Sequence, residues 1–254
     1  MPHLDFKAHR LFYRQQGEGP LLVLLPGNTA TSASFQGEMD HFASRFTVAA
    51  LDFLGTGQSD RLSPWPLNWW RENAAQVSTL IAHLGRGPAW VVGTSGGGLS
   101  ALWTAIDFPA QVRGVIADSV PARFTEALLD QILKERESPS DLLAQFYNHA
   151  QGEDWRDVIA EDNAMLRRFV EQAQGDPLGG ELRRVRCPVL FTASRQDAFL
   201  SDPDETQTAL ARQVRHGRLY LAPRGGHPFM WTAAAEFSAV ADAFLDSVQN
   251  SDGP

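Results

Sequence analysis

Three side chains in this sequence have the types and the order of a nucleophilic catalytic group. Ser95 lies within the run Gly-Thr-Ser-Gly-Gly at residues 93–97, His227 follows two glycines, and Asp197 lies between them in the chain. A serine hydroxyl is a weak nucleophile until a base takes its proton. The base needs a carboxylate to fix its tautomer. We therefore expect Ser95 to attack an acyl carbon, His227 to move the proton and Asp197 to orient His227.

The surroundings of Ser95 predict a sharp turn between a strand and a helix. Residues 89–92 read as a strand, and a helix pattern starts at Gly96. Such a turn is tight and strained, so its neighbours must be small, and Gly93 and Gly97 meet that need. The turn brings the hydroxyl to the carboxyl end of the sheet and to a helix N-terminus, which favours a developing anion. A glycine-rich turn that only allows close packing is the alternative. Phosphate binding is a further alternative, although the motif Gly-x-x-x-x-Gly-Lys-Ser/Thr is absent.

The base and the acid are chosen from several candidates. His227 lies in a short loop between the last strand and the last helix, on the same sheet edge as Ser95. Asp197 follows the strand at residues 189–192 at that edge, whereas its rival Asp118 ends the preceding strand. Three further acids are expected to begin and cap a helix: Asp202, Asp204 and Glu205. The remaining histidines fall on an edge ribbon, on helices or before the last strand: His3, His9, His41, His83, His149 and His216.

Two backbone N–H groups are expected to bind the oxyanion of the tetrahedral intermediate. One belongs to Gly96, directly after the nucleophile. The other belongs to Asn28, because Gly27 permits a turn after the strand at residues 21–25 that can aim this N–H at the site. An ordinary Pro-Gly turn is the alternative.

Alternating strands and helices must position these groups. Amphipathic helical patterns separate short apolar runs that read as strands buried on both faces. This alternation predicts an α/β fold with a doubly wound, mostly parallel sheet. Residues 3–15 are expected to form an antiparallel ribbon at its edge. The predicted strands cover residues 21–25, 46–51, 89–92, 112–117, 189–192 and 219–221.

Residues 121–180 interrupt the alternation with three helical patterns and no strand. We interpret them as an all-helical cap, or lid, inserted before the penultimate strand. Its wide apolar faces either line a pocket or pack only on one another. The predicted division is a core of residues 1–120 and 181–250, a cap of residues 121–180 and a disordered tail of residues 251–254.

Composition narrows the class of protein. The chain has 254 residues and a formal net charge of −8, which argues against binding nucleic acid. Its one cysteine, Cys187, cannot form an internal disulfide, and we interpret it as a buried strand-edge thiol. No signal peptide or membrane span is visible, which predicts a cytoplasmic protein that does not bind membranes. No cluster has metal-ligand spacing, so neither metal nor organic cofactor is expected.

Together, these motifs resemble those of the α/β-hydrolase superfamily. Leu-Pro-Gly-Asn at residues 25–28, Asp-Phe-Leu-Gly-Thr-Gly-Gln-Ser at residues 52–59 and the run around Ser95 carry the resemblance, and the order Ser, Asp, His agrees with it. It covers about residues 1–120 and 183–250. It implies that Asp52 binds backbone N–H groups in a structural turn. Pro26 stands where the family commonly has a histidine that supports the oxyanion loop, and this difference puts the substrate analogy in doubt.

The resemblance implies a serine esterase that acts on a small-molecule substrate. A serine nucleophile argues against dehalogenase and epoxide-hydrolase chemistry, which needs a carboxylate. Carbon–carbon bond hydrolysis or perhydrolysis by the same triad stays open, as does a ligand-sensing protein with little turnover. Four tryptophans favour an apolar substrate, although tryptophans are more often core residues: Trp65, Trp69, Trp70 and Trp231. The oligomeric state stays open.

Overall fold

A computed structural model describes residues 2–249, and the predicted disordered tail lies outside this range. Its described residues form one sheet of eight strands in the order β1-β2-β4-β3-β5-β6-β7-β8. β1 pairs antiparallel with β2 and β2 with β4, whereas the remaining neighbours are parallel. The strands are β1 His3–Phe6, β2 His9–Gln16, β3 Leu21–Leu25, β4 Thr47–Leu51, β5 Ala89–Thr94, β6 Val112–Asp118, β7 Val189–Ser194 and β8 Gly217–Ala222.

This topology confirms the predicted α/β fold with its antiparallel edge ribbon. The predicted strands are all present, with ends that differ by a few residues. β5 extends to Thr94, directly before Ser95, and β7 extends to Ser194, shortly before Asp197. Parallel strands end at a common edge, and that edge is where the loops after β3, β5, β7 and β8 meet.

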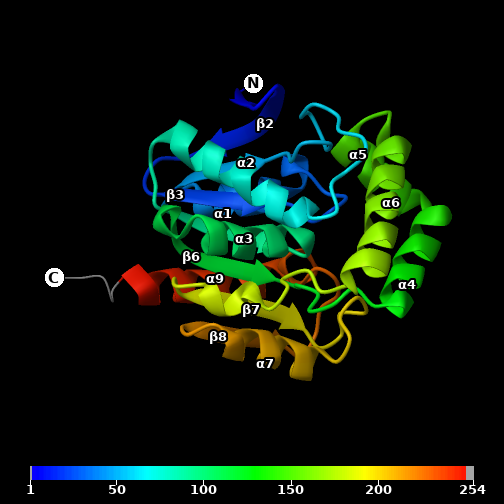
Figure 1. Ribbon diagram of the computed structural model, residues 1–254. Coiled ribbons are helices and arrows are strands. Elements are labelled where there is room, and N and C mark those ends of the chain that lie inside the picture. Colours follow the sequence, from blue (N-terminus) through cyan, green and yellow to red (C-terminus); the bar gives the residue numbers. More distant parts are fainter. Residues whose placement is uncertain (1, 250–254) are drawn as a thin grey trace.

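Helices cover both faces of the sheet (Figure 1). Alternate residues of β3 belong to two hydrophobic cores. Val23 is part of the core with α2, α3 and α7, and Leu22 is part of the core with α1 and α9. The helices are α1 Gln36–Phe42, α2 Trp69–Leu84, α3 Gly96–Asp107, α4 Glu126–Glu137, α5 Asp141–Gln151, α6 Trp155–Ala173, α7 Pro203–Gln213, α8 Phe229–Thr232 and α9 Ala234–Gln249. Three short 3₁₀ turns complete the path: η1 Ser32–Phe35, η2 Pro109–Gln111 and η3 Glu181–Arg184.

Three of these helices, α4 to α6, occupy the chain between β6 and β7 and stand beyond the arrowheads of the strands in Figure 1. We call α4–α6 the cap. Its helices contact one another, and α5 also packs against η1 of the core. The cap therefore lies over the carboxyl edge of the sheet.

The prediction that three acids begin and cap a helix is confirmed for Asp204 and Glu205, which lie in the first turn of α7, but the capping by Asp202 is wrong. Asp202 occupies the residue before α7 but makes no capping hydrogen bond, because its backbone adopts a left-handed conformation with φ of 41°. Proline at the first position of α7 starts the helix instead, since its φ is already helical and its missing N–H would have had no helical partner.

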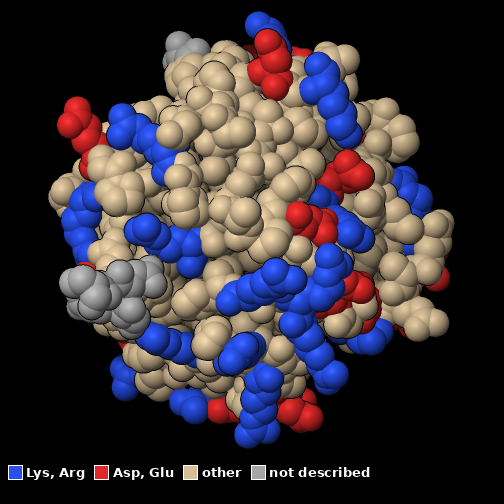
Figure 2. Space-filling model, turned by 60° about the vertical axis from the view of Figure 1, so that its left-hand side comes forward, with Lys and Arg blue, Asp and Glu red and all other residues tan. Residues whose placement is uncertain are grey.

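The surface is uneven in charge. Although the chain is acidic overall, Lys and Arg side chains gather on the face shown in Figure 2. A hollow between the end of α3 and the starts of β7 and β8 is lined by four arginines: Arg183, Arg184, Arg186 and Arg215. Within residues 2–249, none of the helices combines the length and the hydropathy of a transmembrane span.

Candidate active site

Ser95 lies in a strained turn between β5 and α3. Its φ of 53° is in the left-handed region, where a non-glycine residue costs on the order of 1–3 kcal/mol. Neighbouring glycines make the turn feasible: a Cβ on Gly93 would lie 2.2 Å from the carbonyl oxygen of Gly97, and one on Gly97 would lie 2.1 Å from that of Leu25. The Ser95 N–H donates to the carbonyl oxygen of Asp118 at 2.7 Å. These contacts fix Ser95 at the N-terminus of α3.

His227 and Asp197 lie on two other loops, and His227 contacts both Ser95 and Asp197. The Nε2 atom of His227 lies 3.0 Å from Ser95 Oγ, and its Nδ1 atom lies 2.9 Å from Asp197 Oδ2. Asp197 is fully buried, and its Oδ1 also accepts the N–H of Phe199. His227 keeps 18% of its side chain exposed. With Nδ1 protonated, Nε2 is free to accept the hydroxyl proton of Ser95.

The rival carboxylate, Asp118, serves a different purpose. It accepts hydrogen bonds from the hydroxyls of Thr94 and Thr192 and from the N–H of Met230, at 2.7 to 3.1 Å. These bonds tie β5, β6, β7 and α8 together beneath the site. Complete burial raises the pKa of Asp118 to about 6, although its three donors oppose this effect.

The loop after β3 closes tightly on Ser95. A Cβ on Gly27 would lie 3.3 Å from Ser95 Cβ, so the backbone of this loop packs against the nucleophile. A Cβ on Gly96 would lie only 1.9 Å from Asn28 Oδ1, so these two residues are in direct contact. Both residues predicted to bind the oxyanion therefore lie together beside Ser95. Asp52 accepts the N–H groups of Ser32 and Gln58, which confirms its place in a structural turn.

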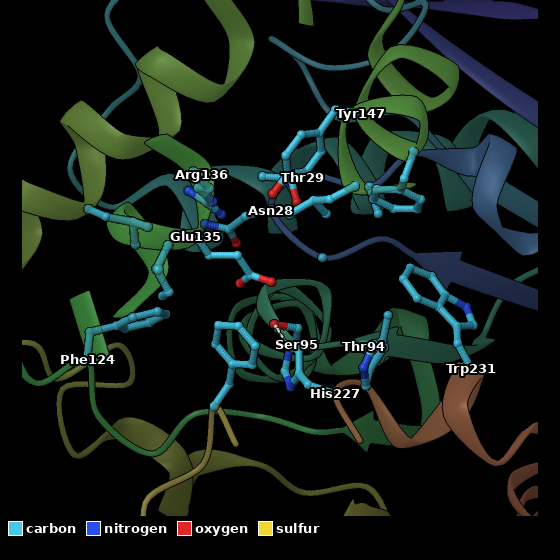
Figure 3. A pocket seen from close by; sticks show the side chains of 18 residues that line it. Asn28, Thr29, Thr94, Ser95, Phe124, Glu135, Arg136, Tyr147, His227 and Trp231 are labelled. Carbon is cyan, nitrogen blue, oxygen red and sulfur yellow. Dashed lines mark hydrogen bonds between the residues drawn. The ribbon is translucent and has the colours of Figure 1, made fainter. Parts of the chain in front are cut away.

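A pocket of about 290 Å³ opens above the triad (Figure 3). Its walls come from the loops after β3 and β5, from the loops that hold Asp197 and His227, and from α4, α5 and α6. Much of the lining is apolar, and two charged side chains of α4, Glu135 and Arg136, also reach it. The apolar lining includes Phe124, Ile132, Leu143, Phe146, Leu166, Phe199 and Trp231. The cap thus lines the pocket instead of only packing on itself.

Of the four tryptophans considered above, only Trp231 lines this pocket. Trp65 and Trp69 stack on each other in the core at 4.6 Å between ring centroids. Trp70 is buried as well, and its indole N–H donates to Asn28 Oδ1 at 2.9 Å. Three of them are therefore core residues.

Sequence reasoning missed a buried ion pair in the cap. Asp162 of α6 is fully buried, and its Oδ2 lies 2.7 Å from Nη1 of Arg136 on α4. Burial raises the pKa of Asp162, an effect that Arg136 and then Asn28 oppose. A signal was present: Asp162 falls on the buried stripe of α6 between Ile159 and Met165, where an acid is out of place.

Among residues 2–249, no group of three metal-ligating side chains lies close enough to hold an ion. The polar side chains that line the pocket come from Ser95, His227 and Thr94, from the loop after β3, from α4 and from Tyr147 of α5. Their arrangement suits proton transfer and nucleophilic attack.

Residues 20–149 match the family model described as the alpha/beta hydrolase fold. The chain belongs to the α/β-hydrolase family. Several relatives of this chain are named as hydrolases. The chain is 38% identical to the 2-(acetamidomethylene)succinate hydrolase of Mesorhizobium japonicum, over 49% of this chain and 45% of that protein. The alignment thus spans about half the length of that relative.

Other comparisons extend over most of the chain. It is 27% identical to human serine hydrolase BPHL, over 93% of this chain and 83% of that protein. The solved structure of E-2-(acetamidomethylene)succinate hydrolase superposes with a TM-score of 0.76 at 22% identity, covering 96% of this chain and 98% of that one. A crystal structure of the enol-lactonase from Burkholderia xenovorans gives a TM-score of 0.70 at 18% identity, over 96% and 100%. At these identities the structural likeness shows the fold alone.

Proposed function

We propose that this protein is a serine hydrolase that cleaves an ester or related acyl bond of a small, apolar substrate through an acyl-enzyme. The observation that carries the proposal is the unbroken line from Asp197 through His227 to Ser95, with contacts of 2.9 and 3.0 Å. Nucleophile, base and orienting acid within hydrogen-bond reach are what activation of a serine requires.

The reaction follows from that geometry. Ser95 Oγ attacks the carbonyl carbon while His227 Nε2 takes its proton, and the carbonyl oxygen becomes an oxyanion. The N–H groups of Asn28 and Gly96 bind that oxyanion, at a helix N-terminus that also favours negative charge. The bond to the leaving group then breaks, and His227 gives the proton to the departing oxygen. Water then attacks the acyl carbon while His227 takes its proton. The bond from that carbon to Ser95 Oγ breaks, His227 returns the proton to Oγ, and the acid is released.

The pocket supports a small substrate. Its volume of about 290 Å³ lies just below the range of about 300–1,000 Å³ for ligand pockets. The aromatic and aliphatic lining of the cap favours an apolar group beside the scissile bond. Two relatives are named 2-(acetamidomethylene)succinate hydrolase and "Putative carbamate hydrolase RutD", which makes amides and carbamates worth testing beside esters.

Labelling with a fluorophosphonate tests the activated serine. We expect stoichiometric modification of the wild type at Ser95 and no modification of Ser95→Ala. Mass spectrometry of the labelled protein and of its peptides locates the adduct. Ser100, a buried serine of α3, gives a matched control, and Ser100→Ala should label like the wild type. An unmodified wild type, or equal labelling of Ser95→Ala, contradicts the proposal.

A panel of p-nitrophenyl esters of increasing acyl length tests the substrate class. We expect turnover to be fastest for short acyl chains and to fall once the chain exceeds the pocket. Carbamates, amides and a vinylogous diketone belong in the same panel, because the same triad serves those reactions. Turnover of the diketone alone would favour carbon–carbon hydrolysis, and tight binding without turnover would favour a ligand sensor.

A further inference from the structure

A chain of buried polar contacts runs from the cap to the loop that follows β3. Arg136 of α4 pairs with Asp162 of α6, with 2.7 Å between Nη1 and Oδ2. Asp162 Oδ1 accepts the side-chain N–H of Asn28 at 2.7 Å, and Asn28 Oδ1 accepts the indole N–H of Trp70 at 2.9 Å. Figure 3 shows Arg136 and Asn28 on the same side of the pocket, across from Ser95. The four side chains connect α4, α6, the loop and α2.

These contacts leave the Asn28 side chain one orientation. Its amide nitrogen faces a carboxylate, which only accepts, and its amide oxygen faces an indole N–H, which only donates. Rotating the amide by half a turn would set donor against donor and acceptor against acceptor. The oxygen also abuts Gly96, where a Cβ would lie 1.9 Å away. The immobilised side chain of Asn28, one residue of the proposed oxyanion site, therefore touches Gly96, the other residue of that site.

The ion pair is costly to bury, which makes its position informative. Asp162 is fully buried and the Arg136 side chain is 9% exposed, so both charges have lost most of their water. Such pairs add little stability compared with apolar residues of similar volume, but loss of one partner is strongly destabilising. A pair in this position defines where Asp162 Oδ1 lies, and so where Asn28 lies.

We propose that Asp162 is a positioning residue that holds Asn28, and through it the N–H groups of Asn28 and Gly96, in place to bind the oxyanion. This inference rests on the proposed function. Donors fixed before the reaction stabilise developing charge without reorganising when it forms. The cap thereby takes part in the chemistry through the loop after β3, as well as forming a wall of the pocket.

Replacing Asp162 by Asn tests this role with little change in volume. The carboxylate pairs with Arg136 through Oδ2 and accepts from Asn28 through Oδ1, whereas an amide presents an oxygen to one of them and an N–H to the other. We expect kcat to fall about 10- to 100-fold, part of the loss of about 10²–10³ for a missing oxyanion donor, with KM changed less than about threefold. The affinity for a boronic acid, which forms a tetrahedral adduct on Ser95, should fall by a similar factor.

Asp157→Asn is the matched control, since Asp157 lies on α6 with its side chain exposed. Its kcat, KM and boronic acid affinity should equal those of the wild type. Circular dichroism and thermal unfolding show whether each variant is folded. If folded Asp162→Asn has wild-type kcat and boronic acid affinity, the positioning role is wrong.

A double-mutant cycle separates positioning from general damage. Asn28→Ala keeps the backbone N–H and removes the side chain that Asp162 holds, so it should lower kcat in the same way. If Asp162 acts through Asn28, the double variant should be no more than about twofold slower than the slower single variant. Losses that multiply would contradict the inference. Asn28→Ala alone also tests it where Asp162→Asn does not fold, because wild-type kcat in that variant would overturn it.

The wild type keeps the two proposals distinguishable. A wild type that neither reacts with the fluorophosphonate nor turns over any substrate contradicts the proposed function. An active wild type whose Asp162→Asn variant matches it in kcat and boronic acid affinity contradicts the role of Asp162 alone.

Discussion

The two sides of the pocket are built in different ways. On the core side, backbone geometry positions Ser95: a left-handed residue, glycines that allow close approach, and an N–H bond to the neighbouring strand. On the cap side, a side-chain contact positions the loop after β3, because the Asn28 amide donates to Asp162, which lies 134 positions away in the chain. Nucleophile geometry thus depends on the sheet, whereas the loop after β3 depends on both the sheet and the cap.

This difference separates two ways in which a substitution can reduce activity. A change on the core side removes a group or deforms the turn, so it acts on the chemical step directly. A change on the cap side alters how well the oxyanion donors are aligned, and the same helices also line the pocket. Effects on kcat without effects on KM therefore distinguish alignment from binding.

Two buried acids of the core provide the largest expected contrast. Asp197→Asn leaves His227 with a partner that favours the wrong tautomer, so we expect kcat to fall about 10⁴-fold. Asp118→Asn disturbs the hydrogen bonds from Thr94, Thr192 and Met230. It leaves the contact between Asp197 and His227 in place, so kcat should fall less than about 10-fold. Steady-state kinetics on one ester compares them. A loss confined to Asp118→Asn would reverse the assignment of the acid.

Substitution at Gly96 tests the point where the two sides meet. A Cβ there would lie 1.9 Å from Asn28 Oδ1, so Gly96→Ala must displace the Asn28 side chain. We expect kcat to fall on the order of 10²-fold, the loss typical for an oxyanion donor. Gly37→Ala on α1 is the control, because a Cβ there meets nothing within 4 Å. Equal kcat for these two variants would show that Asn28 can move without consequence.

Much of the core side could be predicted from the sequence, because its determinants are local. Apolar runs identify the strands. Because parallel strands point in the same direction, the residues that follow them lie at one edge of the sheet. Ser95, Asp197 and His227 each follow a strand closely, and the structure brings them within hydrogen-bond distance. Asp197 lies in a loop beyond its strand, whereas Asp118 is the last residue of β6, and this difference favours Asp197 over Asp118.

The cap side could be predicted only in outline. Apolar periodicity predicted three helices, but the contacts of Asp162 and Arg136 depend on how those helices pack on one another and on the core. Neither residue has a sequence neighbour that reveals its partner, because Asn28 and Asp162 meet only after the chain between β6 and β7 has folded. The acid on the apolar stripe of α6 indicated a buried partner without naming it.

A further expected effect of Asp118 concerns stability and not turnover. Asp118 has its pKa raised from an ordinary 3.8 to about 6, so the folded protein holds this proton more tightly than the unfolded chain. Its contribution to stability is complete below about pH 4 and is lost as pH rises through about 6. That gap corresponds to about 3 kcal/mol, because one pKa unit is worth about 1.4 kcal/mol.

Asp118→Asn has no such proton, so the wild type should lose about 3 kcal/mol relative to this variant between pH 4 and pH 7. Urea unfolding at both values measures the two free energies, and groups shared by the proteins cancel in the comparison. Asp118→Ala should show the same pH-dependent difference on top of a larger constant loss, since it lacks the proton and also leaves a cavity. Parallel curves for wild type and Asp118→Asn would mean that Asp118 is ionised in the folded protein as readily as in the unfolded chain. The three donors beneath the triad would then fully offset the cost of its burial.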